Sequence, residues 1–268
     1  MTLLQKILGQ KYKWVYCVWY NFQITNTNIK GNILSSLPLV LNSLAVVFVW
    51  SKANPSIAIF TYLIVGRIYK SFCESIPENS VALDIVEGRL TTKILYPKDY
   101  FTYRFFSLLG RRVQRNSLEI LTFVFTAILA TYFFGPIQAT SFQTILILLL
   151  FVPVSYFINN TLGFWAGSLA FFLKDKREFN AVQDSYNTTK IMLYGLIIPL
   201  DQLPFSDFFS FLPTAYFVHH PMQIYLGRYN NFQILQTFGA GIVWCILLWI
   251  IARIVFKSGL KRNEATGL

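Results

Sequence analysis

The Lys and Arg residues of this chain are confined to segments that alternate with long apolar runs. Only Lys52 and Arg228 fall outside four basic segments. The other 21 of the 23 Lys and Arg residues lie in 1–30, 67–116, 174–190 and 253–262. Because short cytoplasmic loops of membrane proteins concentrate Lys and Arg, this pattern fits a chain that crosses a bilayer six times. It predicts an all-α integral protein of the inner (cytoplasmic) membrane with both termini in the cytoplasm.

The composition supports a membrane protein over a water-soluble one. The chain is 54% hydrophobic and 18% aromatic, and only 13% of its residues are charged, against roughly 25% in soluble domains. The net charge of +11 belongs to residues that flank apolar runs and do not cluster on one polar face. Attraction to anionic membrane lipids explains such charges, and we expect no nucleic-acid partner.

We expect two parts along the chain. Residues 1–32 predict a cytoplasmic amphipathic interface helix, because the apolar residues of 3–22 recur at spacings of three and four. A first membrane span is the alternative there, but the apolar residues form a stripe and not a continuous run. Residues 33–268 predict a transmembrane domain with spans at about 33–51, 56–72, 117–134, 141–173, 182–203 and 236–256.

Two of these spans are unusual. The fourth apolar stretch is about twice the length of an ordinary span, yet two crossings would place the basic cluster 174–177 outside. We therefore predict one long, tilted crossing, broken near Pro153 or at Asn159-Asn160. The fifth is apolar only over 191–200, so its helix must begin near Val182, and its polar inner half should face protein or a wet cavity.

Residues 204–222 combine three prolines with many aromatic residues. A full crossing there would conflict with a cytoplasmic carboxyl terminus, so short re-entrant helices at the outer side fit better. Irregular backbone at that depth must be covered by protein. The segment could be a lid or could simply fill space.

The sequence contains no signature of an enzyme. It has no G-x-x-x-x-G-K-[ST] loop and no metal-spaced cluster of His and Cys, and its only histidines are the adjacent His219 and His220. An interfacial polar pair explains these two better than a metal site. No ionisable residue lies mid-membrane to harvest an ion gradient. We expect no cofactor in this chain, and any work it does must be driven by another protein.

The predicted cytoplasmic coupling loop, 74–104, directs attention to that other protein. A short helix at 80–87 would place Val81, Ile85 and Val86 on one side and Asp84 and Glu87 on the other, and Gly88 is suited to end it. An exposed apolar helix just under the membrane is a docking surface for a partner. The alternative is a helix packed on the ends of its own spans.

At this loop the sequence resembles the ABC type-2 exporter permeases, whose hallmark is I-x-x-G-x-L followed by an apolar-Pro pair. Residues 85–90 read Ile-Val-Glu-Gly-Arg-Leu, and Leu95-Tyr96-Pro97 follow. The resemblance covers nearly the whole chain, and one departure is Ile197-Ile198, where relatives often carry a glycine a few residues earlier; Gly195 is the candidate substitute. Further matches, in chain order, are Phe164-Trp165, the spaced Pro199, Pro204, Pro213 and Pro221 with Gly227, and the basic tail 258–262 ending near Gly267.

The resemblance implies a half-transporter. Two six-span subunits would pair, as a homodimer or with a related permease, and two separate cytoplasmic ABC ATPase subunits would bind ATP and Mg beneath them. The loop helix would be the coupling helix, and closure of the ATPases would tilt the second and third spans to alternate access. The residues expected to dock the ATPase are Val81, Asp84, Ile85, Val86, Glu87, Gly88, Arg89, Leu90 and Pro97.

The candidate substrate path is drawn from polar and aromatic residues: Asn42, Asn187, Thr188, Phe205 and Phe209. Each Asn or Thr could instead hydrogen-bond a neighbouring helix. An aromatic, uncharged interior suggests an amphipathic or lipid-like cargo such as a drug, lipid or peptide. Two other functions stay open, a non-transporting membrane scaffold or assembly factor and a gradient-driven carrier.

Overall fold

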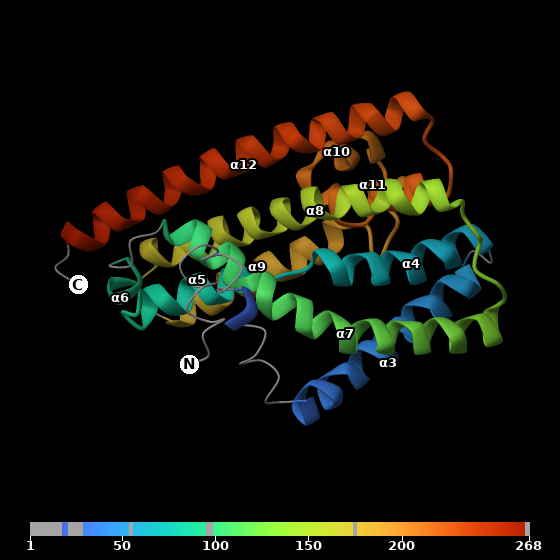
Figure 1. Ribbon diagram of the computed structural model, residues 1–268, viewed down its shortest axis with the longest axis horizontal. Coiled ribbons are helices and arrows are strands. Elements are labelled where there is room, and N and C mark those ends of the chain that lie inside the picture. The colour runs from blue at the N-terminus through green and yellow to red at the C-terminus, as the bar shows by residue number, and fades with distance from the viewer. Residues whose placement is uncertain (1–17, 21–28, 54–55, 95–98, 174–175, 266–268) are drawn as a thin grey trace, which may run out of the picture.

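The computed structural model (Figure 1) describes residues 18–20, 29–53, 56–94, 99–173 and 176–265. Within these ranges the chain forms helices joined by turns, and no strand occurs there. The elements are α3 (Ile29–Ala53), α4 (Ile57–Cys73), α5 (Pro77–Val86), α6 (Leu90–Ile94), α7 (Tyr100–Phe134), α8 (Phe142–Ser168), η2 (Leu169–Phe172), α9 (Lys176–Leu193), η3 (Leu200–Gln202), α10 (Ser206–Phe211), η4 (Pro213–Phe217), α11 (His219–Tyr225) and α12 (Asn231–Ala265).

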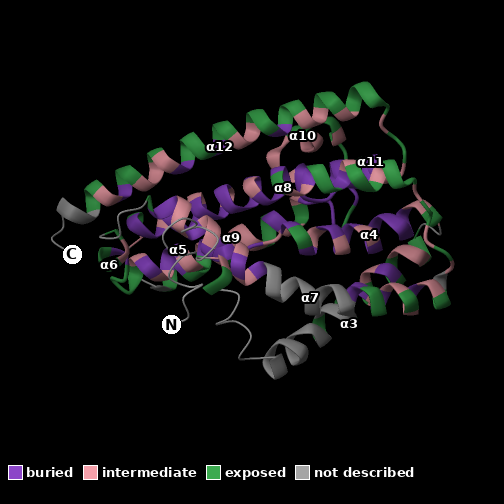
Figure 2. Cartoon of the chain, in the orientation of Figure 1, coloured by how far each residue is buried: buried purple, intermediate pink, exposed green. Residues whose placement is uncertain are grey.

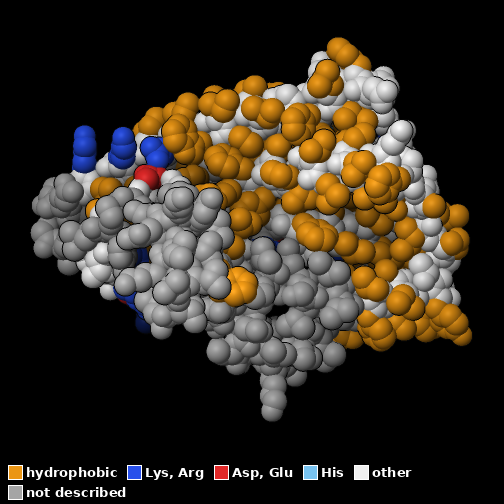
Figure 3. Space-filling view, viewed as in Figure 1, with side chains coloured by type: hydrophobic (Ala, Val, Ile, Leu, Met, Phe, Trp, Pro, Cys, Tyr) orange, Lys and Arg blue, Asp and Glu red, His pale blue; other side chains and the backbone are white. Residues whose placement is uncertain are grey.

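The two ends of the molecule differ in charge. The helices α5 and α6 and the C-terminal end of α12 lie at one end of the long axis, and the start of α12 lies at the other (Figure 1). Exposed Lys257, Lys261 and Arg262 belong to the end that carries α6. Figure 3 shows Lys and Arg side chains gathered there and hydrophobic side chains over much of the remaining face. The arrangement agrees with the charge segregation of the sequence.

Apolar helices dominate the described part of the chain. Phe142–Phe172 and Asn231–Arg262, of 31 and 32 residues, are long and apolar enough to cross a membrane. Leu41–Ala53 and Phe123–Phe133 are shorter apolar helices. The expected first and second spans, 33–51 and 56–72, fall almost wholly within α3 and α4. The all-helical fold is therefore confirmed for the described residues, and the long apolar helices agree with the expected membrane protein.

The third expected span is the second half of a longer helix. α7 contains 35 residues and is about 52 Å long at about 1.5 Å per residue. It begins at Tyr100 because the Asp99 carboxylate accepts a hydrogen bond from the Thr102 backbone N–H at 3.2 Å, which caps the helix. Gly135, at φ 106°, ends it. The loop predicted for 74–104 is thus helical from residue 100.

The break predicted in the fourth span is wrong. α8 runs without interruption through Pro153, Asn159 and Asn160, and it tightens into the 3₁₀ turn η2 only after Ser168. The asparagines leave the helical backbone intact because Asn160 bonds back to the Tyr156 carbonyl at 3.0 Å and Asn159 bonds outward to another segment. Figure 2 shows α8 buried over much of its length.

The fifth span does not continue as a helix to residue 203. α9 ends at Leu193, and Gly195 follows with φ +75°, a conformation that side chains rarely adopt. A Cβ on Gly195 would lie 2.8 Å from the Tyr62 hydroxyl oxygen. The apolar run 191–200 therefore turns back into the protein. Lys190 is buried as expected, but Asp184 and Thr188 in the same polar half are exposed.

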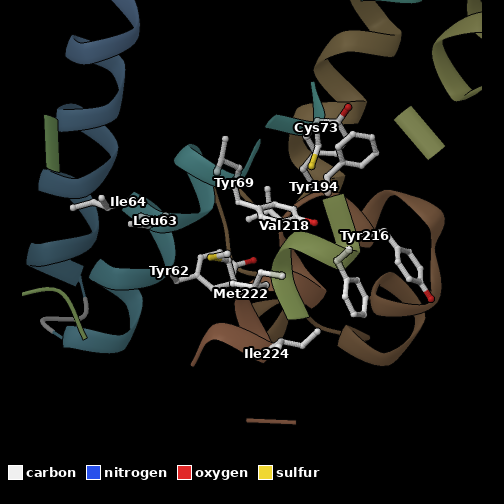
Figure 4. Close-up of a cluster of buried hydrophobic side chains, with 14 of the residues drawn as sticks. Tyr62, Leu63, Ile64, Tyr69, Cys73, Tyr194, Tyr216, Val218, Met222 and Ile224 are labelled. Carbon is white, nitrogen blue, oxygen red and sulfur yellow. The ribbon is translucent and has the colours of Figure 1, made fainter. Parts of the chain in front are cut away.

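The short helices expected in 204–222 are present as α10, η4 and α11. Val218 and Met222 are completely buried, and Figure 4 shows them among Tyr62, Tyr194 and Tyr216. This burial favours a space-filling role for η4 and α11, whereas α10 contains no buried residue. His219 and His220 are also buried within the protein. Both rings hydrogen-bond to Ser210. The His219 ring contacts the Ser210 hydroxyl, and the His220 ring contacts the Ser210 carbonyl oxygen.

The expected amino-terminal amphipathic helix lies mostly outside the described residues. Residues 18–20 are helical. They lie against α7, because a Cβ on Gly110 would overlap the Val18 carbonyl.

Candidate functional site

The candidate site is the coupling segment, defined as residues 77–94, which comprises α5, a turn and α6. Pro77 occupies the first turn of α5, where its missing N–H costs no hydrogen bond. Gly88 ends the helix with φ +68° and nothing within 4 Å of a Cβ placed on it, as the sequence predicts. α6 begins at Leu90, and the Thr91 hydroxyl donates to the Gly88 carbonyl at 2.8 Å. The segment is a helix, a sharp turn and a second short helix.

One face of α5 packs closely on α8. A Cβ on Gly167 would lie 2.6 Å from the Glu78 carbonyl oxygen and 2.8 Å from the Val81 Cβ. A Cβ on Gly163 would contact the Pro77 and Glu78 side chains. Val81, expected in the docking surface, is therefore completely buried. This face of α5 therefore packs on the end of α8 and is not available to a partner.

Asp84 is the centre of a buried charge cluster. Its carboxylate accepts hydrogen bonds from the Tyr100 hydroxyl at 2.5 Å and from Lys93 and Arg104. Arg104 also donates to the Ser80 carbonyl at 3.1 Å. The sequence placed Asp84 on the polar outer side of the helix; it lies inside because two cations and a phenol compensate the carboxylate.

Burial also changes the proton affinities of the partners of Asp84. Burial, with a smaller effect from the charge of Arg111, lowers the pKa of Arg104 to about 10. Burial also lowers the pKa of Lys93, and it raises the pKa of Tyr100. At neutral pH Arg104 stays protonated and Tyr100 stays a neutral donor. The cluster therefore joins α5 to α6 and to the first turns of α7.

A second buried ion pair joins α5 to α9. The Lys190 Nζ lies 2.8 Å from a Glu78 carboxylate oxygen, and both side chains are almost fully buried although 112 residues separate them. Lys190 also lies 5.0 Å from the centre of the Tyr186 ring. The other carboxylate oxygen of Glu78 has no hydrogen-bond partner among the residues described. The pair holds the start of the coupling segment to the fifth long helix.

Asn159 adds a third connection, which the sequence reasoning missed. Its side-chain amide donates to the carbonyls of Cys73 and Ser75 at 3.2 and 3.1 Å. Its side-chain oxygen accepts from the Tyr194 hydroxyl at 3.2 Å. An asparagine pair inside a long apolar run was the available signal, but it suggested a helix break. Asn159 instead ties the turn before α5 to the end of α9.

We name residues 85–89, 91, 92 and 94 of the coupling segment the docking tip, after the partner expected there; all of them except Ile85 are exposed. Val86 and Ile94 are 42% and 44% exposed, and Ile85 is half-buried. Glu87 and Arg89 form an exposed ion pair. Of the other residues expected to dock a partner, Leu90 is buried and Pro97 lies outside the described residues.

This arrangement can be compared with known families. Residues 28–267 match the sequence profile described as ABC-2 family transporter protein. The chain belongs to the ABC-2 transporter family. No curated protein and no solved structure matches it. An ABC-2 permease is the membrane-embedded component of an ABC transporter, has no ATPase site of its own, and works with an ABC ATPase subunit.

The candidate path residues of this ABC-2 permease lie on or next to three different helices, α3, α9 and α10. Asn42 on α3 accepts a hydrogen bond from Arg67 on α4 at 3.2 Å. This contact agrees with the alternative in which Asn42 bonds a neighbouring helix. Asn187 is half-buried and Thr188 is exposed on α9. Phe205, 81% exposed, precedes α10, and Phe209 is half-buried within it. Most of these side chains lie at the surface of the single permease chain.

Proposed function

We propose that this chain is a six-crossing permease subunit of an ATP-driven exporter, paired as a dimer, with separate ATPase subunits docked on the docking tip. The observation that carries the proposal is that the docking tip exposes apolar residues, whereas the helix α5 behind it is packed and bonded to neighbouring helices. Val86 and Ile94 are exposed, whereas Val81, Asp84 and Glu78 beneath them are buried and bonded to three long helices. The family membership supports an ATPase as the partner.

The proposed topology places the docking tip in the cytoplasm. The crossings are α3, α4, α7, α8, α9 with the re-entrant segment, and α12. The tip then shares its end of the molecule with the basic C-terminal end of α12 (Figure 1). The excess of Lys and Arg supports the cytoplasmic assignment of that end and of both termini.

The anchoring supports a mechanism for coupling. A force on the tip reaches α8 through the glycine contacts of α5, α7 through Asp84 and Arg104, and α9 through Glu78 and Lys190. Because packed elements shift as units, closure of the ATPases would move the inner ends of these helices together. The path between two permease copies would then open alternately to each side.

The proposed cargo is amphipathic or lipid-like. Phe205, Phe208 and Phe211 expose large aromatic surfaces next to the re-entrant helices. A path formed between two copies would be lined by residues that are exposed on one copy, which supports Phe205 and Thr188 as contributors. The proposed path contains aromatic and uncharged polar groups, which suit a drug, lipid or peptide better than a small ion.

A double substitution tests the docking proposal. Ile85→Asp with Val86→Asp places two charges on the apolar tip, and we expect the ATPase to be lost from the purified complex and export to stop. Ser258→Asp with Lys261→Asp is the matched control, since both residues are exposed at the same end but lie outside the tip. Unchanged ATPase co-purification and export in the tip variant would refute the proposal.

A second measurement separates export from the other functions. An exporter should change its ATPase rate when cargo is added to the reconstituted complex. A scaffold would leave the rate unchanged, and a gradient-driven carrier would transport without any ATPase present. Either of these results would contradict the proposed function.

A further inference from the structure

A cavity of about 240 Å³ lies between the coupling segment and the C-terminal half of α12. Its floor is apolar and includes Ile94 of α6, Phe164 of α8, and Phe256 and Leu260 of α12. The Phe256 ring stacks on Tyr100 with ring centres 5.3 Å apart, which closes the floor. The cavity is therefore a hydrophobic hollow where α6, α7, α8 and α12 meet.

The rim of this cavity carries two cations and one carboxylate. Arg253 pairs with Asp99 at 2.6 Å and lies 4.5 Å from the centre of the Trp249 ring. Its Nε is buried and has no hydrogen-bond partner among the described residues. Lys257 is exposed, and the described part of the chain gives it no ion-pair partner. The rim thus has an excess of positive charge.

The cavity lies where the apolar surface of α12 ends. Along α12, exposed Ile250, Ile251 and Ile254 come before Lys257, and exposed Lys261 comes after it. Trp249 is one turn before Arg253, and tryptophan is enriched at headgroup depth. Figure 3 shows basic side chains next to the hydrophobic face at this end. An apolar floor below a basic rim at this depth matches the two ends of a phospholipid.

We propose that this cavity binds an anionic phospholipid of the cytoplasmic leaflet. The phosphate lies at Lys257 and Arg253, and the beginning of one acyl chain lies on Phe256 and Leu260. Basic pockets between membrane helices on the cytoplasmic side attract anionic headgroups, whereas a zwitterionic lipid gains less there. The leaflet assignment rests on the topology of the proposed function, but the binding chemistry does not.

The lipid would also contact the coupling segment. Tyr100 lines the cavity and donates to Asp84 at 2.5 Å, and Ile94 belongs to the docking tip. A bound lipid therefore packs against the base of the tip and against α12 together. Asp99 competes with the phosphate for Arg253, so removal of its charge should strengthen lipid binding.

Lipid retention by the purified permease, without any ATPase, tests this proposal. Native mass spectrometry would compare phosphatidylglycerol with phosphatidylcholine on the permease and on three variants. We expect Lys257→Glu to weaken phosphatidylglycerol binding roughly tenfold or more, because the substitution removes a cation and places an anion beside the lipid phosphate. Asp99→Asn should strengthen it, and asparagine still caps α7.

Lys261→Glu is the matched control, because it makes the same charge change one turn further along α12 and does not line the cavity. Its effect on phosphatidylglycerol should stay below about threefold, because its exposed charge lies outside the cavity and acts through solvent. Equal losses in Lys257→Glu and Lys261→Glu, or equal retention of both lipids by the unaltered permease, would overturn the proposal. The result is independent of ATPase docking, so the two proposals can fail separately.

Discussion

At the scale of single residues, Asp84 makes the sharpest prediction. Asp84→Asn would leave buried Arg104 and half-buried Lys93 without their carboxylate. Breaking a buried ion pair by removing one partner costs about 3–5 kcal/mol, so we expect the melting temperature of the purified permease to fall markedly. Glu87→Gln is the matched control, because Glu87 pairs with Arg89 at the surface and its loss should cost less than about 1 kcal/mol. Equal melting of Asp84→Asn and the unaltered permease would contradict the cluster.

Sequence reasoning identified the turn residue but not the buried acid. Gly88 could be predicted because the end of an α-helix favours a residue with positive φ, and it has φ +68°. The burial of Asp84 could not be predicted, because its position in the helical pattern places it on the polar side, which usually faces solvent. Its partners Lys93, Tyr100 and Arg104 lie 9, 16 and 20 residues further along the chain. Contacts of that kind are set by tertiary packing.

At the scale of elements, the pair of Glu78 and Lys190 should couple α5 to α9. Glu78→Gln or Lys190→Met alone removes one charge and strands the other in a buried site, so each should destabilise the permease by about 3–5 kcal/mol. The double variant should cost much less than the sum, because no buried charge is left without a partner. Thermal unfolding of the four proteins measures this coupling.

The exposed pair of Asp201 and Arg228 supplies the control for that cycle. Both residues lie at the surface, so their coupling should be only about 0.2–1 kcal/mol. Additive effects of the Glu78 and Lys190 substitutions would mean that the two helices are not joined by this contact.

The positions of most helices could be predicted from the sequence, but their ends were less certain. Apolar runs correctly located α3, α4, α8 and α12. The run at 191–200 was mistaken for the continuation of a helix, although Gly195 turns the chain after Leu193. Asn159 was mistaken for a break, because its hydrogen bonds to the turn before α5 are visible only in the folded structure.

At the scale of the whole molecule, the segregation of Lys and Arg predicted how the ends differ. The basic residues of α12 and the coupling segment lie at one end, and the apolar surface covers much of the rest (Figure 3). The packing of α5 on the glycines of α8 could not be predicted from the sequence, because it depends on contact between segments far apart in the chain. For the same reason, fewer of the residues predicted to dock a partner are exposed than the sequence suggests.

The central claim is that the docking tip faces the cytoplasm, where an ATPase can push on it. The most direct test introduces Arg89→Cys into a permease whose native cysteines are replaced, with Asn231→Cys at the opposite end as the control. A membrane-impermeant thiol reagent should label residue 89 only in inverted vesicles and residue 231 only in right-side-out vesicles. Labelling of residue 89 from the outside of intact cells would contradict the account.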